Sequence, residues 1–357
     1  MRKWTICALA VLALLGSVMT ASAQELTEAL PPEAQELLDG LEEENAVDGG
    51  LGAGLARLWE KGCESFLDIL RQSLRGVVLL LGAVLVCGVA EDCLQAAGSE
   101  VNYVSMAGAL VVTALTAGSV RGLMTLGMET IEQLDVFSKA LLPTLAAAVA
   151  AGGGAVTAGT GQVIAVCFAD ALITLIRGLL LPMTYFLAAA ATADAMLPRH
   201  GLGTVAKAAS RVLTWLLTGS LVLFTGYLTL SGAVSTSADA LTVQVTRSAV
   251  GAMPVVGRIL SDAAGSVLAG AGVVKNAIGV FGLLGVLAAC LGPFVRLGVQ
   301  YLLYKLTAFL AGMTAAPELA KLIDALGGVF GLMLGMTGSC ALLLLISISS
   351  AILVVTP

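Results

Sequence analysis

Beyond residue 24, seven stretches of this chain, each 15 to 33 residues long, contain no Asp, Glu, Lys or Arg. About 20 apolar residues in an α-helix, rising about 1.5 Å each, cross a hydrocarbon core about 30 Å thick. Because lipid offers the backbone no hydrogen-bonding partner, such stretches enter a membrane as helices. The sequence therefore predicts an all-α, polytopic transmembrane helical bundle of about six to eight spans. The stretches are residues 76–90, 101–120, 140–169, 178–193, 212–238, 276–295 and 325–357.

The composition agrees with a surface covered by lipid. Only 12% of the 357 residues are charged and 58% are hydrophobic, whereas a water-soluble domain carries about 25% charged residues. The 42 glycines point the same way, because small residues let transmembrane helices approach closely. These observations exclude a soluble enzyme and make membrane lipid the first expected partner.

The N-terminus has the pattern of a cleavable signal peptide over residues 1–23. Arg2 and Lys3 precede an apolar stretch at 6–18, and Ala21-Ser22-Ala23 offers the small residues that a signal peptidase requires. An uncleaved anchor is the alternative. The next nine acidic residues occur before residue 49 without a single Lys or Arg. We therefore expect an acidic extracytoplasmic arm at 24–54, an amphipathic juxtamembrane segment at 55–75 and the polytopic membrane domain at 76–357.

Two of the charge-free stretches contain signals for a helix interruption. In 140–169, Pro143 and the glycines at 152–154 favour either a broken or re-entrant helix or a glycine-rich loop between two ordinary helices. The 33-residue stretch at 325–357 is longer than one span requires. We expect a bend in it near residues 335–339.

The sequence offers little for catalysis or for cofactor and metal binding. It has one histidine, His200, and contains no G-x-S-x-G, H-E-x-x-H or Gly-Lys pattern. The seven cysteines include no C-x-x-C pair, which argues against a disulfide framework and a zinc site. A basic footprint for nucleic acid is also missing. We therefore predict no enzyme activity, no catalytic, cofactor-binding or metal-binding residue, and no nucleic-acid partner.

Polar side chains inside the apolar stretches are the candidate functional residues. A lone charge in the middle of a membrane is costly, so such groups normally face a partner or a water-filled cavity. Asp170 and Arg177 are seven residues apart, which places them on one face of a continuous helix. A polar lining or ion path is one interpretation, and a position near an interface or in helix packing is the other. The candidates are Asp170, Arg177, Asp194, Lys275 and Asn276.

Two sets of glycines predict close contacts between helices. Within each set the spacing is three or four residues, which aligns the glycines on one helix face. We expect most of these contacts to lie within the bundle. The sets are Gly279, Gly282 and Gly285, and Gly327, Gly331 and Gly335.

The order of these features resembles that of the stage III sporulation protein AE family of endospore-forming Firmicutes. The resemblance is most specific at GAMPVVGRILSDAAG (251–265) and VVKNAIGVFGLLG (273–285), which stand between the polytopic body and a glycine-rich apolar tail. It implies a multi-pass protein of the mother-cell membrane around the forespore. The implied role is that of a subunit of a channel or secretion-like complex that supports late forespore gene expression.

The resemblance also implies the partners. They are the sister proteins of the same operon, one of them an ATPase-like protein, and a forespore-side protein. ATPase activity would then come only through a partner. The alternative from the residues alone is a self-sufficient secondary transporter that uses the intramembrane charged groups.

Overall fold

The computed structural model describes residue 35 and residues 46–96, 103–151, 155–196, 202–251, 257–313 and 317–353. Within these ranges the chain is helical apart from a turn at Gly312 and Met313, and no strand occurs. The elements are α3 (Ala46–Ala96), α4 (Tyr103–Ala151), α5 (Ala155–Leu175), the π-helical turn η1 (Ile176–Leu180), α6 (Leu181–Met196), α7 (Leu202–Gly251), α8 (Gly257–Ala311) and α9 (Pro317–Leu353).

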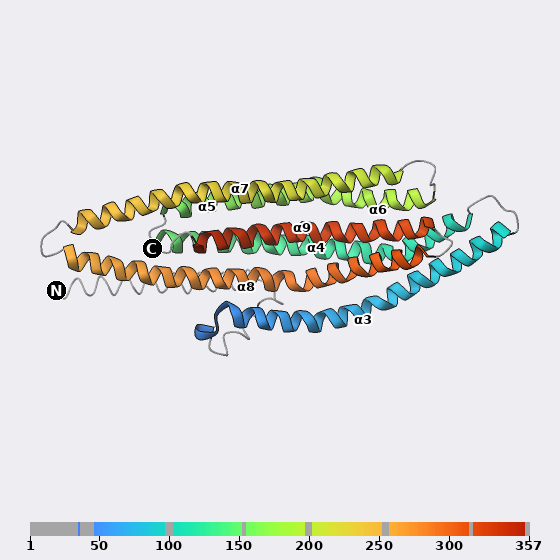
Figure 1. The fold of residues 1–357 in the computed structure, drawn as a ribbon, viewed down its shortest axis with the longest axis horizontal. Helices are drawn as coiled ribbons and strands as arrows, with labels where there is room; N and C mark the ends of the chain where they lie inside the picture. Colours follow the sequence, from blue (N-terminus) through green and yellow to red (C-terminus); the bar gives the residue numbers. More distant parts are fainter. Residues whose placement is uncertain are drawn as a thin grey trace.

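The helices lie side by side along one axis, and α5, η1 and α6 follow one another in a single rod (Figure 1). In the described part of the chain, six helices are long and apolar enough to cross a membrane. The predicted all-α bundle of six to eight spans is thereby confirmed at its lower limit. The six segments are Gly54–Cys93, Met106–Ala151, Val163–Met196, Gly203–Leu230, Gly272–Ala311 and Pro317–Ile352.

Most of these helices are longer than a membrane requires. The lengths of 49 residues for α4 and 55 for α8 correspond to about 74 and 83 Å, against a hydrocarbon core of about 30 Å. A hydrocarbon core of that thickness can therefore cover only part of each such helix.

Helix α9 is the centre of the bundle. It lies between α7 and α8 with α4 behind it (Figure 1), and it packs against every helix from α4 to α8. Its buried side chains come from all around the helix, as expected for a helix surrounded by protein. They include Leu322, Ile323, Phe330, Met333, Met336 and Ile348.

Glycines allow α8 and α9 to approach each other closely. A Cβ atom at Gly327 would lie 3.2 Å from the Cβ of Tyr304 and 3.6 Å from the backbone nitrogen of Lys305. At Gly331 it would lie 3.0 Å from the ring of Tyr301. The aromatic residues of α8 thus occupy the space that a side chain on α9 would fill.

One expectation about helix continuity was wrong. The predicted bend near residues 335–339 does not interrupt α9, which continues through Gly335 to Leu353. Residues 121–139, which separate two charge-free stretches, do not interrupt a helix and form the middle of α4. The charged residues of this segment are spaced so that they share one face of the helix. The remaining face is apolar and can pack in the bundle, so the helix continues.

Glycines 152–154, on which the expected interruption depends, lie outside the described residues. Helix α4 continues past Pro143 to Ala151, and α5 begins at Ala155 and packs against α4. The expected limits at 54 and 75 fall inside α3, which is unbroken from Ala46 to Ala96. The signal peptide, the acidic arm up to residue 45 except Gln35, and residues 252–256 of the first family motif lie outside the described residues.

The contact between α8 and α9 predicts that the same substitution is destabilising at one glycine and nearly neutral at its neighbour. Gly327→Val would push α9 away from the α8 backbone and should lower the free energy of unfolding by about 1–3 kcal/mol. Gly328→Val is the matched control, because a Cβ there meets no atom within 4 Å, and should change stability by less than about 0.5 kcal/mol. Thermal unfolding of the two variants in detergent measures the difference. Equal loss in both would contradict the proposed contact.

Candidate functional site

A group of charged side chains lies along the middle of α4. We call Arg121, Glu129, Glu132, Asp135 and Lys139 the α4 charged stripe. The steps between them are three, four or eight residues, so they share one helix face and extend about 27 Å along the axis. The opposite face holds the core residues Leu134, Phe137 and Leu141. The middle third of helix α4 is therefore amphipathic.

The stripe is joined to the next rod by an ion pair. Arg177 Nη2 lies 2.9 Å from Glu132 Oε1, and the two side chains are 46% and 54% exposed. Arg177 belongs to η1, where the Leu181 N–H donates to the Ile176 carbonyl five residues earlier. Proline at 182 has no N–H to continue an α-helical ladder, and a π-turn is a frequent local solution at functional positions. The turn sets the position of the guanidinium group opposite α4.

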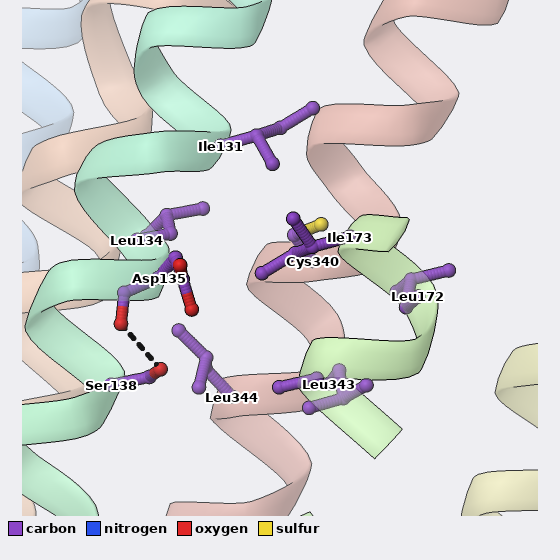
Figure 2. Close-up of a pocket in the computed structure, with 10 residues that line it drawn as sticks. Ile131, Leu134, Asp135, Ser138, Leu172, Ile173, Cys340, Leu343 and Leu344 are labelled. Atoms are coloured by element: carbon purple, nitrogen blue, oxygen red, sulfur yellow. Dashed lines mark hydrogen bonds between the residues drawn. The ribbon is translucent and has the colours of Figure 1, made fainter. Parts of the chain in front are cut away.

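Asp135 borders a small cavity between α4, α5 and α9 (Figure 2). Its side chain is 17% exposed, and Lys139 Nζ lies 2.8 Å from its Oδ2 atom. Ser138 Oγ donates to the Asp135 carbonyl at 2.8 Å. The rest of the lining is apolar apart from Cys340, and the volume is about 10 Å³, which is about the least that holds one water molecule. The cavity is too small for a substrate.

The structure separates the predicted polar residues into different settings. Asp170 is exposed on α5, and the ion pair of Arg177 is made with Glu132 of α4. Asp194 is half-buried, and its Oδ1 atom accepts a hydrogen bond of 2.8 Å from the Gly203 N–H. That contact satisfies a free donor at the start of α7 and ties α6 to α7, which is a structural role.

Lys275 and Asn276 lie far along the chain from this stripe, near the start of the α8 span. Lys275 is 1% exposed, and its Nζ donates to the Ile352 carbonyl at 2.9 Å. A cation at the C-terminal end of a helix is stabilised by the unpaired carbonyl groups there, so Lys275 links α8 to the end of α9. Asn276 is exposed beside it. The five candidates therefore do not form one site.

The glycines of α8 also lie at helix contacts. A Cβ at Gly279 would meet the Ile352 side chain of α9, and one at Gly282 would lie 2.7 Å from Leu141 of α4. Gly285 is buried. Gly335 of α9 is exposed, and its nearest neighbour is Leu217 at 3.8 Å, so its approach is looser than that of Gly327 or Gly331.

Sequence reasoning missed the α4 charged stripe. The charges lay between two charge-free stretches and were read as a boundary, not as part of a helix. The missing signal was their spacing, because residues 129, 132, 135 and 139 follow the three- and four-residue steps of a helix face.

The comparisons with known proteins decide the family. The profile described as stage III sporulation protein AE matches residues 43–356. The chain belongs to the stage III sporulation protein AE family. The resemblance found in the sequence is thus confirmed.

A curated relative supports this assignment. The protein named stage III sporulation protein AE of Bacillus subtilis (strain 168) is 25% identical over 215 residues. The match covers 60% of this chain and 53% of the relative, so the chain spans about half the length of the curated protein that it matches. No solved structure matches significantly.

The Glu132–Arg177 pair is testable by charge reversal. Glu132→Arg or Arg177→Glu alone places like charges together and should lower the unfolding temperature, while the double variant should recover most of the loss. A coupling of about 0.2–1 kcal/mol is expected from an exposed pair. A thermodynamic cycle of the four proteins in detergent measures it, and strictly additive effects would show that the two groups do not interact.

Lys275 should be sensitive to loss of its charge. Lys275→Met keeps the length of the side chain but removes the donor to Ile352, which should cost about 1–3 kcal/mol of unfolding free energy. Lys321→Met is the control, because the Lys321 side chain is 66% exposed and pairs with Glu318 in the same helix turn. Urea or thermal unfolding in detergent compares the two, and an equal effect would contradict the buried link.

Proposed function

We propose that this protein is a non-enzymatic, multi-pass membrane subunit of a channel or secretion-like complex between mother cell and forespore. In this proposal it is required for stage III of sporulation and for late forespore gene expression. The observation that carries the proposal is the family match over residues 43–356. The six helices long enough to span a membrane within the described ranges are compatible with a membrane subunit.

The proposed location is the mother-cell membrane that surrounds the forespore. The proposed partners are the other proteins of the stage III sporulation operon, including its ATPase-like member, and a forespore-side protein. The four helices of 49 to 55 residues, α3, α4, α7 and α8, support this idea, because their ends extend well beyond about 30 Å of hydrocarbon and are available to such partners.

Deletion of the gene in its endospore-forming host tests the proposal. We expect engulfment to begin and heat-resistant spores to be lost, together with the activity of a late forespore reporter gene. Reintroduction of the wild-type gene should restore both. Normal numbers of heat-resistant spores in the deletion strain would contradict the proposal.

A second candidate function is a self-sufficient secondary transporter. The Glu132–Arg177 ion pair inside two membrane-spanning segments favours it, because paired charges in apolar helices often mark ion pathways. Purified protein in liposomes discriminates the two functions. Ion-driven solute uptake without any partner would favour the transporter, whereas normal sporulation of Asp170→Asn and Lys275→Ala strains would remove the basis for an ion path through those residues.

A further inference from the structure

A polar groove opens on the flank of the bundle between α4 and α8. Its volume is about 670 Å³, and its lining includes Arg121, Glu129, Arg296 and Gln300. Arg121 and Arg296 are exposed. The two guanidinium groups and one carboxylate give the groove a net charge of +1. Both helices are long and apolar enough to span a membrane.

The polar residues of the groove stand next to a buried tyrosine. Tyr304 of α8 is only 2% exposed, and its hydroxyl lies near the side chains of two lining residues, Gln300 and Ser119.

Two glycines make the groove deep enough to admit a ligand. A Cβ at Gly118 or Gly122 would meet no atom within 4 Å, so the α4 backbone itself forms one wall. On the same helix face, four and three residues apart, stand Val111, Leu115 and Gly118. Val111 and Leu115 are each 47% exposed. An uncovered apolar strip therefore leads along α4 into the positively charged groove.

We propose that this groove binds the headgroup of an anionic phospholipid. The phosphate lies between Arg121 and Arg296, because guanidinium groups match the geometry and charge of phosphate oxygens. One acyl chain runs along Val111 and Leu115. A net charge of +1 suits a headgroup with a single negative charge, such as phosphatidylglycerol. An acidic peptide would satisfy the arginines but would leave the apolar strip uncovered, so the lipid fits both features. The site is independent of the proposed sporulation role.

Native mass spectrometry of the full chain, stripped of lipid in detergent and titrated with phosphatidylglycerol or phosphatidylcholine, tests the proposal. Wild type should bind phosphatidylglycerol more tightly than phosphatidylcholine. Each of Arg121→Gln and Arg296→Gln should weaken phosphatidylglycerol binding by about fivefold, as expected for one cation near an anionic headgroup. Gly122→Leu should weaken it without changing any charge, because the new side chain fills the groove.

Matched controls are available on other helices. Arg211→Gln removes an exposed arginine from α7, and Gly76→Leu adds a side chain on α3 where a Cβ meets no atom within 4 Å. Both should bind phosphatidylglycerol like wild type, and circular dichroism should show unchanged helix content in all variants. Equal binding of the two lipids by wild type, or unchanged binding by the Arg121→Gln/Arg296→Gln protein, overturns the proposal. So does a Gly122→Leu variant that keeps the lipid but loses a co-purifying protein, since the groove is then a protein contact.

Discussion

The close contact of α8 with α9 is the constraint on which the rest of the bundle depends. Within lipid no hydrophobic force drives helices together, so association relies on surface fit. Gly327 and Gly331 supply that fit by admitting Tyr304 and Tyr301 of α8. With α8 fixed, α9 becomes a central column against which α4, α5, α6 and α7 also pack. Loss of the contact would disturb several helices at once.

Polar contacts join α8 to α9 at two distant points of this interface. Near the start of the α8 span, Lys275 reaches the last turn of α9, and farther along Lys305 Nζ lies 2.6 Å from Asp324 Oδ1. The polar connections thus stand at the two ends of a long apolar interface. Such an arrangement fixes the register of the helices, because sliding by one turn would break both connections.

Charge-free stretches were a good guide to the number and type of elements, and a poor guide to where helices end. The rule that charges mark boundaries failed at 121–139, because a helix tolerates charges that share one face and leaves the other face for the core. The expectation of a bend at Gly335 failed for a related reason. Glycine weakens an isolated helix by about 1 kcal/mol, but contacts of α9 with its neighbours outweigh that cost.

The candidate site was harder to predict than the fold. Arg177 stood out as a charge in an apolar stretch, but its partner could not be identified, because Glu132 lies 45 positions earlier on another helix. Seven-residue spacing suggested Asp170 as a neighbour, and spacing alone contains no information on other helices. Asp194 and Lys275 were recognised as unusual for the same reason as Arg177. Only the packing of the helices shows that they join helix ends.

The π-turn at η1 sets the rotation of α6 relative to α5. A π-turn holds one residue more than the α-helical turn it replaces, so it offsets the faces of α5 and α6 by about 100°. Removing one residue between positions 176 and 180 would produce a straighter rod. It would also rotate the whole of α6, moving buried residues such as Thr184 and Leu187 out of the core. The number of residues in this short turn therefore sets which face of α6 enters the core.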